Sequence, residues 1–148
     1  MSNAVKLTCG ACGQTNRLPS ERLSAGPKCG VCGAKLMAAK VTELDQAIHD
    51  KMARSDEVPV VIDYWAPWCG PCRMMAPQFE KASQALAGKA RFAKINTEDF
   101  PAVSQRLGIR GIPLLILWHR GREVARLSGA RPAGEIEAFV RQAVGTTT

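Results

Sequence analysis

Two cysteines separated by a Gly-Pro dipeptide follow a strongly apolar run in the middle of the chain, and this arrangement restricts both the local fold and the chemistry. The run at 60–65, Val-Val-Ile-Asp-Tyr-Trp, is typical of a buried central strand. Pro71, between Cys69 and Cys72, suits the first turn of a helix because it has no backbone donor. The sequence therefore predicts a strand followed by a helix that begins near Cys69. The apolar positions of that helix recur at helical spacing and are Met75, Phe79, Ala82 and Leu86.

Two thiols at such a strand-to-helix junction can cycle between a dithiol and a disulfide. Unpaired N–H groups and the helix dipole at a helix N-terminus favour the thiolate of Cys69 over the thiol. Two cysteines at this spacing also form half of a zinc site, so the spacing alone leaves both chemistries open. The residues around the pair decide between them and favour thiol–disulfide exchange.

The segment 63–73, Asp-Tyr-Trp-Ala-Pro-Trp-Cys-Gly-Pro-Cys-Arg, closely resembles the active site of the thioredoxin family. Further matches follow in the family's order: Lys94, the segment Gly-Ile-Arg-Gly-Ile-Pro at 108–113, which resembles the cis-proline loop, and glycines at 121 and 129. The resemblance covers residues 41–144. It implies an α/β thioredoxin fold, in which helices flank a central mixed sheet.

Two positions depart from the family pattern. Leu114 follows the expected cis-proline where thioredoxins usually carry Thr, and Trp118-His119 replaces the commoner Phe-Lys. These departures bear on substrate preference and not on the thiol chemistry.

Four further cysteines form two Cys-x-x-Cys motifs near the start of the chain. The motifs are separated by sixteen residues, which fits the Cys-x2-Cys-x15-20-Cys-x2-Cys zinc pattern. Four thiolates close a tetrahedral shell with no open position, so the metal that they bind is structural. Two disulfides or free thiols are the alternative, which the doubled motif and a reducing compartment together disfavour. We expect one structural zinc ion, held by Cys9, Cys12, Cys29 and Cys32.

The N-terminal unit is too small to fold by core burial alone, because about forty residues bury too little surface, and a bound metal would supply the missing free energy. The unit resembles a zinc ribbon, and a zinc ribbon before a thioredoxin domain is the arrangement of the thioredoxin 2 type. We therefore predict a zinc-ribbon domain at 1–38 and a thioredoxin domain at 39–148. The linker at 35–40 is largely apolar and lacks the Gly and Ser of a flexible tether, so the two domains should pack together.

The net charge of +7 is concentrated near the start of the chain. Residues 1–40 hold six basic residues against the single acid Glu21, a net charge of +5. No aromatic residue lies among these charges to stack on bases, so a solvated surface is favoured over a nucleic-acid site. No run reaches the 18 or so apolar residues of a membrane span, and residues 1–8 lack the apolar core of a signal peptide. We expect a cytoplasmic protein with no membrane contact.

The rest of the larger domain reads as alternating helices and strands. Thr42 is a candidate N-cap for a helix that runs to about Ser55, with an apolar face of Leu44, Ala47, Ile48 and Met52. His49 lies off that face, so we expect it to be exposed. Strands are expected at 91–95, 114–118 and 123–128, with a hairpin turn at 119–122. Pro132 should open a last helix that turns Ile136, Phe139, Val140 and Ala143 inward.

The two active-site cysteines have different expected roles. Cys69 comes first and lies nearer solvent, so its thiolate is expected to attack a target disulfide and form a mixed disulfide. Cys72 then resolves that intermediate. Asp63 lies inside an apolar strand, where a carboxylate is costly unless it is protonated or paired. The resemblance implies that Asp63 is a buried proton acceptor for Cys72 and that Lys94 modulates it; the alternatives are a surface position at the strand end for Asp63 and a solvated lysine for Lys94.

The substrate-binding residues are also implied by the resemblance. Pro113 would be a cis-proline beside the thiols, which leaves the Ile112 backbone free to pair with an extended substrate; a trans proline in an ordinary loop is the alternative. The expected groove around Cys69 is lined by Trp68, Gly70, Pro71, Gly129 and Ala130.

The resemblance implies a monomeric protein-disulfide reductase that acts through Cys69 and Cys72 on disulfide-containing proteins. An NADPH-dependent thioredoxin reductase would return electrons to it, and the chain itself should bind neither flavin nor nicotinamide, because it has no glycine-rich dinucleotide motif. An oxidase or isomerase is one alternative, but these more often carry His where this chain has Gly70-Pro71. An inert thioredoxin fold joined to a nucleic-acid-binding ribbon is the other, and the complete Trp-Cys-Gly-Pro-Cys motif argues against it.

Overall fold

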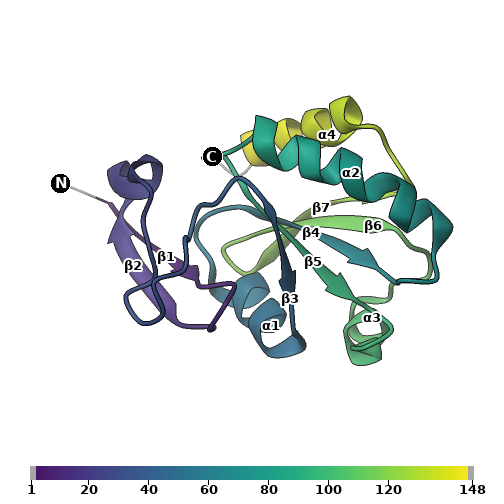
Figure 1. Cartoon of the computed structure of the whole chain (residues 1–148), viewed down its shortest axis with the longest axis horizontal. Coiled ribbons are helices and arrows are strands. Elements are labelled where there is room, and N and C mark those ends of the chain that lie inside the picture. The colour runs from purple at the N-terminus through teal and green to yellow at the C-terminus, as the bar shows by residue number, and fades with distance from the viewer. Residues whose placement is uncertain (1–2, 147–148) are drawn as a thin grey trace.

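The computed structural model describes residues 3–146 and consists of a small two-stranded unit beside a larger unit built on a five-stranded sheet (Figure 1). We call residues 3–38 the ribbon unit and residues 39–146 the main unit. The ribbon unit holds β1 (Ala4–Thr8), β2 (Thr15–Pro19) and the 3-10 helix η1 (Ser20–Ala25). The main unit holds β3 (Val41–Leu44), α1 (Gln46–Ser55), β4 (Val60–Trp65), α2 (Gly70–Ala85), β5 (Arg91–Asn96), α3 (Pro101–Leu107), β6 (Leu114–His119), β7 (Arg122–Ser128) and α4 (Ala133–Gly145).

The main sheet is mixed and has the strand order β3-β5-β4-β6-β7. β5 lies between β3 and β4 and is parallel to both, whereas β4, β6 and β7 pair antiparallel in turn. Helices α2 and α4 cover one face of the sheet, and α1 and α3 cover the other (Figure 1). The predicted α/β fold, with helices on both sides of a central mixed sheet, is confirmed.

The two faces of the sheet have separate hydrophobic cores, because side chains alternate along each strand. Val61 of β4 packs with Phe79 of α2 and Val140 of α4 on one face. Ile62 and Tyr64 of the same strand pack with residues of α1 and α3 on the other face. Asp63 alternates with Ile62 and Tyr64, so it belongs to the face that α2 covers.

The structure corrects the prediction for residues 42–49. Thr42 lies inside strand β3 and caps no helix; α1 starts after Asp45, whose side chain accepts the N–H of Ile48 at 2.8 Å. His49 is 1% exposed and not solvated, whereas Ala47 of the predicted apolar face is exposed. The imidazole is tolerated in the core because it has polar partners there: Nε2 lies 2.8 Å from Tyr64 Oη, and Nδ1 lies 2.9 Å from an Asp50 oxygen.

The C-terminal elements agree with the sequence. Arg120 and Gly121 form the two-residue turn between β6 and β7, and both have positive φ, as a tight hairpin of this kind requires. A side chain at Gly121 would also collide with the Arg54 carbonyl oxygen, 2.7 Å from the position of a Cβ atom. The last helix turns Ile136, Val140 and Ala143 into the core, with Phe139 packed at its edge. Helix α3, which precedes these elements in the chain, is not among the helices expected from the sequence.

The ribbon unit packs directly on the main unit, as expected from the linker. Arg91 of β5 is buried at the junction: it donates to the carbonyl oxygens of Thr8 and Leu36, at 2.8 and 2.9 Å, and forms a 2.8 Å ion pair with Asp56. The second Asp56 oxygen accepts both the N–H and the hydroxyl of Thr8. Each side-chain nitrogen of Arg91 and each carboxylate oxygen of Asp56 therefore has a partner, and Thr8 and Leu36 contribute theirs from the ribbon unit. Figure 1 places the ribbon unit at the opposite end of the molecule from the start of α2.

Candidate active site and metal centre

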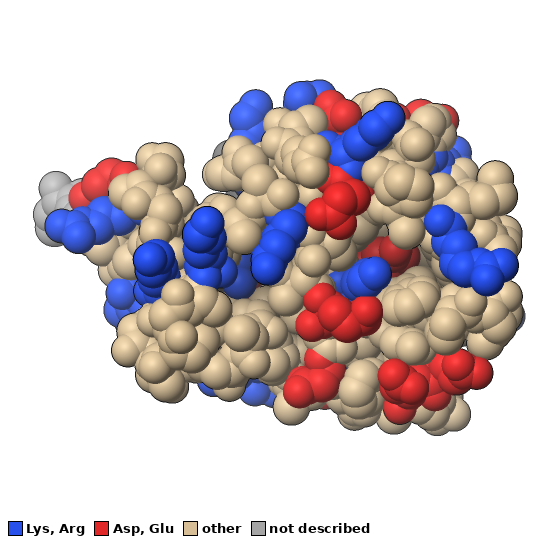
Figure 2. All heavy atoms as spheres, in the orientation of Figure 1, with Lys and Arg blue, Asp and Glu red and all other residues tan. Residues whose placement is uncertain are grey.

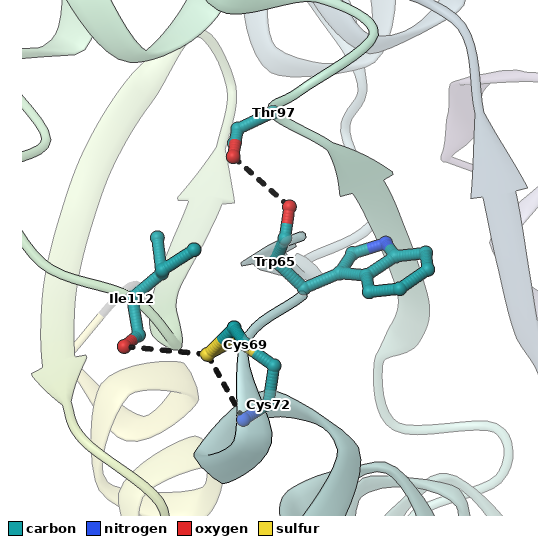
Figure 3. Close-up of a disulfide and its surroundings, with 5 residues drawn as sticks. All are labelled: Trp65, Cys69, Cys72, Thr97 and Ile112. Carbon is teal, nitrogen blue, oxygen red and sulfur yellow. Dashed lines mark hydrogen bonds between the residues drawn. A yellow bond between two sulfur atoms is a disulfide. The ribbon is translucent and has the colours of Figure 1, made fainter. Parts of the chain in front are cut away.

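Cys69 and Cys72 form a disulfide at the start of α2, with 5.2 Å between their Cα atoms (Figure 3). Cys69 is the N-cap residue of the helix, and its Sγ accepts the N–H of Cys72 at 3.2 Å. Pro71 occupies the first turn, as predicted. The helix therefore begins on Cys69, and an N–H group of its first turn points at that sulfur, which favours a negative charge there.

The loop before β6 reaches the disulfide from the other side. The Ile112-Pro113 peptide bond is cis, which confirms the prediction for Pro113. The carbonyl oxygen of Ile112 lies 3.8 Å from Cys69 Sγ, a contact that Figure 3 draws as a dashed line. A shallow cavity of about 420 Å³ runs along this loop, lined by residues 108–114 together with Arg126, Ser128 and Gly129. Ile112, Pro113 and Gly129 of the predicted groove thus share one surface.

The remaining predicted groove residues differ in exposure. Trp68 is 67% exposed, although large apolar side chains are normally buried, and Met74 of α2 is 74% exposed. Pro71 and Ala130 are exposed, and Gly70 is half-buried. An apolar side chain left in solvent next to the Cys69 sulfur offers a contact for a partner protein.

Asp63 is buried beneath this surface. It is 3% exposed, and its Oδ1 has no hydrogen-bond partner among the residues that the structure describes. Burial raises the pKa of Asp63 from 3.8 to about 7, the positive charge of Lys94 acts against this rise, and the negative charge of Glu43 adds to it. The alternative of a surface carboxylate at the strand end is wrong. A buried carboxyl group with a pKa near neutrality can both accept and release a proton.

Lys94 lies beside Asp63 in the sheet, and its ammonium has two other partners. Lys94 pairs in register with Asp63 of β4 and with Glu43 of β3. Its Nζ lies 3.9 Å from a Glu43 oxygen and 4.8 Å from the centre of the Trp65 ring. The indole N–H of Trp65 donates to the other Glu43 oxygen at 3.2 Å. Sequence reasoning missed Glu43, because it read residues 42–55 as one helix.

Thr97 is a further residue near the site that the sequence did not indicate. Its hydroxyl donates to the carbonyl oxygen of Trp65 at 3.0 Å (Figure 3), and its N–H donates to the same oxygen at 2.8 Å. This pair of bonds ties the end of β4 to the loop after β5. The strand end that leads into the active-site loop is therefore held in place. Nothing in the sequence around Thr97 indicates this contact.

The four N-terminal cysteines come together in the ribbon unit, where their sulfur atoms all lie within 4.8 Å of one another. Across the two motifs, Cys9 Sγ lies 3.6 Å from Cys32 Sγ, and Cys12 Sγ lies 3.7 Å from Cys29 Sγ. Zinc–sulfur bonds of about 2.3 Å in a tetrahedron place the sulfurs about 3.8 Å apart, so the geometry fits a zinc ion. Within the described residues no disulfide joins these four thiols.

Each ribbon motif has the same backbone geometry. The N–H groups of Ala11 and Val31 point at the first sulfur of their motifs, both at 3.4 Å. Gly13 and Gly33 then adopt positive φ of 83° and 77°, which reverses the chain. Backbone N–H groups directed at sulfur stabilise thiolates, the form that binds metal. The two motifs are thus equivalent halves of one four-cysteine cluster.

Comparisons with known proteins agree with both sites. The thioredoxin family profile matches residues 40–142, and the profile described as "Thioredoxin 2, N-terminal", a zinc ribbon, matches residues 8–34. Thioredoxin C-3 of Corynebacterium nephridii is 39% identical over 136 residues, which cover 92% of this chain and 93% of that protein. The thioredoxin of Haemophilus influenzae is 35% identical over 104 residues, covering 70% of this chain and 97% of that protein.

Solved structures of thioredoxins share the fold of the main unit. Malassezia sympodialis thioredoxin superposes with a TM-score of 0.61 at 32% identity, over 68% of this chain and 86% of that one. Chloroplastic thioredoxin z superposes with a TM-score of 0.66 at 27% identity, over 74% and 98%. Among the helices of residues 3–146, none is both long and apolar enough to cross a membrane. On its sequence profile, its relatives and its Cys69–Cys72 site, the chain belongs to the thioredoxin family.

Proposed function

We propose that this thioredoxin reduces disulfide bonds in other proteins through Cys69 and Cys72. The observation that carries the proposal is the redox pair at the N-terminus of α2, facing the cis-proline loop. In the reduced protein, the Cys69 thiolate attacks one sulfur of the target disulfide. A bond forms between Cys69 and that sulfur, the target disulfide breaks, and the second target sulfur leaves as a thiolate.

Cys72 completes the reaction. Its thiolate attacks Cys69 Sγ, so the intramolecular disulfide forms and the first target sulfur is released. The target gains two electrons and the Cys69–Cys72 pair loses them. Cys72 is 2% exposed, and its thiol must lose a proton before it can attack, so the second step calls for a nearby base.

Asp63 is the proposed base. It lies on the sheet face that α2 covers, and its pKa of about 7 lets it take a proton from Cys72 at neutral pH. Lys94 would modulate that pKa through its charge. Cys69 needs no base of this kind, because the helix N-terminus already stabilises its thiolate.

The proposed substrate surface surrounds Cys69. Trp68, Gly70, Pro71, Gly129 and Ala130 would contact the target, and the free backbone of Ile112 before Pro113 would pair with an extended segment of it. Support comes from the exposure of Trp68 and from the cavity along the cis-proline loop.

The electrons would come from an NADPH-dependent thioredoxin reductase, the usual partner of this family. One structural zinc ion would be held by Cys9, Cys12, Cys29 and Cys32 in a domain at 1–38, and the catalytic domain would span 39–148. The sulfur geometry supports the metal assignment.

We propose the cytoplasm as the compartment, because reducing conditions keep zinc-binding thiols free of disulfides. A monomer remains our prediction.

The assignment of roles is tested by trapping. Cys72→Ser should accumulate a mixed disulfide between Cys69 and a target protein on non-reducing gels, because the first step proceeds and the second cannot. Cys69→Ser should give no adduct. Equal trapping by both variants would contradict the roles.

The role of Asp63 is tested by stopped-flow kinetics at pH 7. Asp63→Asn should slow resolution by about 10²-fold or more, the usual contribution of a positioned base, and leave the initial attack nearly unchanged. An unchanged resolution rate would remove Asp63 from the mechanism.

A further inference from the structure

A row of three charged side chains crosses the sheet next to the proposed base. Glu43 of β3, Lys94 of β5 and Asp63 of β4 occupy directly adjacent register positions. All three belong to the face that α2 covers, since Val41 and Val61, two residues before Glu43 and Asp63, pack in the core of that face. Lys94 therefore stands between two carboxyl groups that compete for it.

The structure shows which carboxyl group holds the ammonium. Lys94 Nζ lies 3.9 Å from Glu43 and over the ring of Trp65, and Trp65 donates its indole N–H to the same Glu43. These three side chains form a closed triangle of contacts. Among the described residues, Asp63 forms no ion pair and its Oδ1 has no hydrogen-bond partner. Figure 3 shows the Trp65 indole directed away from the Cys69–Cys72 pair.

We propose that Glu43 is a positioning residue of the catalytic reaction: by binding Lys94 and Trp65, it keeps the ammonium away from the Asp63 carboxyl group and so keeps Asp63 basic enough to accept the Cys72 proton. This inference rests on the proposed role of Asp63. Glu43 touches neither cysteine and is half-exposed at the edge strand, where a stability role alone would be small.

The direction of the effect is fixed, because both consequences of removing the Glu43 charge have the same sign. A negative charge near Asp63 is lost, and Lys94 becomes free to approach Asp63. Each change favours the ionised carboxylate and lowers the pKa of Asp63. The other charged group that acts on Glu43 is Asp99, in the loop after β5, and burial together with Asp99 raises the pKa of Glu43 while Trp65 and Lys94 lower it.

The test is a carbon NMR titration of the Asp63 carboxyl group in the oxidised protein, where Cys69 and Cys72 are joined in a disulfide and do not titrate. Glu43→Gln should lower the Asp63 pKa by about 0.5 to 1 unit, as expected for a screened charge two strands away. Glu43→Asp, whose shorter side chain keeps the charge but loses its reach to Lys94, should give a smaller shift in the same direction. Glu98→Gln is the matched control: it removes an exposed acid of the nearby loop and should leave the pKa unchanged.

A second background separates positioning from simple charge. With Lys94→Met in place, Glu43→Gln should lose at least half of its effect, because no ammonium is left to be released. A full-sized shift in that background, no shift in the single variant, or an upward shift would each overturn the inference. The pH midpoint of the resolving step should move down with the pKa. A lowered pKa with an unmoved midpoint would support the placement of Lys94 by Glu43 and refute the role of Asp63.

Discussion

The two units of the molecule use the same Cys-x-x-Cys spacing for opposite purposes. In the ribbon unit two such motifs face each other, and each sulfur contacts a sulfur of the other motif at 3.6 or 3.7 Å. In the main unit a single motif opens α2, and its two sulfurs bond to each other. The first arrangement fits a metal ion and the second cycles electrons.

The residues inside and after each motif account for the difference. Gly13 and Gly33 take positive φ directly after the ribbon motifs, so the chain reverses and each motif stays a loop. Pro71 commits the active-site motif to a helix, and the N–H of Cys72 then points at Cys69 Sγ. The spacing of two cysteines thus fixes their proximity, and the local backbone decides whether they face each other or a second pair.

The largest effect should come from comparing the removal of an active-site cysteine with the removal of a ribbon cysteine. Cys69→Ser should abolish protein-disulfide reduction and leave the bound zinc in place, whereas Cys29→Ser should lose the zinc and keep most of the reductase activity. The physical reason is that the four ribbon thiols form a site of their own, without Cys69. Metal analysis and a turnover assay on the same samples check this. Zinc lost from Cys69→Ser but retained by Cys29→Ser would break the distinction.

Removal of zinc should unfold the ribbon unit and weaken, without unfolding, the main unit. Structural zinc contributes about 10–16 kcal/mol of apparent free energy in small zinc domains, more than the few core residues of the ribbon unit supply. The main unit keeps both of its cores but loses the Thr8 and Leu36 partners of Arg91 and Asp56.

We expect this loss to lower the free energy of unfolding of the main unit by about 1–3 kcal/mol, measured by urea denaturation with and without a chelator. A fragment that starts near Ala39 should behave in the same way and still reduce a small disulfide. Complete unfolding of that fragment would mean that the units form one cooperative fold.

The parts of this structure that the sequence predicted best are those with long local patterns. Strand β4 and helix α2 follow from an apolar run and a helical period, and the cluster of four N-terminal cysteines follows from repeated spacing. Strand β3 was missed because it has only four residues and lies at the sheet edge, so its Thr42 and Leu44 also fit a helix start. A short edge strand is specified by its partner β5, which lies about fifty residues away in the chain.

The burial of polar side chains was the other feature that the sequence did not predict, and the reason is again that their partners lie far away in the chain. His49 can be buried because it forms a hydrogen bond with Tyr64. Arg91 can be buried because it forms hydrogen bonds with Thr8 and Leu36 and an ion pair with Asp56. Such partners compensate the cost of burial only once the chain has folded. Asp63 could be recognised because it interrupts an apolar strand, but Glu43 gave no such signal.

Two buried aspartates of the main unit extend the comparison: Asp63 lies near the active site, and Asp56 lies at the junction with the ribbon unit. Among residues 3–146, one Asp63 oxygen has no hydrogen-bond partner, whereas both oxygens of Asp56 at the junction are paired. Asp63→Asn should therefore raise the free energy of unfolding at pH 8, by up to roughly 4 kcal/mol for a pKa raised from 3.8 to about 7. Asp56→Asn should lower it by about 3–5 kcal/mol, because Arg91 is left as an uncompensated buried charge.

The gain from Asp63→Asn should depend on pH. Between pH 4 and 7 the folded protein keeps a proton on Asp63 that the unfolded chain has released, so this group reduces stability as pH rises through that range and by a constant amount above it. The variant should thus match the parent protein near pH 4 and exceed it most at pH 8. Denaturation curves at the two pH values check this, and a gain that is equal at both would contradict the burial of a titrating carboxyl group.

The smallest effect concerns the charge of the ribbon unit. Its five basic residues take part in no ion pair among residues 3–146, and Figure 2 shows Lys and Arg side chains spread over this unit while Asp and Glu gather on the lower part of the main unit. The ribbon unit lies far from Cys69, and at physiological salt charges are screened over about 8 Å. The charge of the ribbon unit should therefore affect only a target large enough to contact both the ribbon unit and the surface around Cys69.

We therefore expect Lys28→Gln with Lys35→Gln, two exposed lysines that face each other across a β-bridge, to slow reduction of a large acidic protein by less than about threefold at low salt. The difference should vanish at 0.5 M salt, where screening is nearly complete. Lys81→Gln with Lys89→Gln is the matched control, since it removes two exposed lysines from the main unit, and a small uncharged disulfide should report equal rates for all three proteins. An equal loss of rate in the control pair would show that net charge alone matters, and the ribbon unit would then be a structural cover for Arg91 without a docking role.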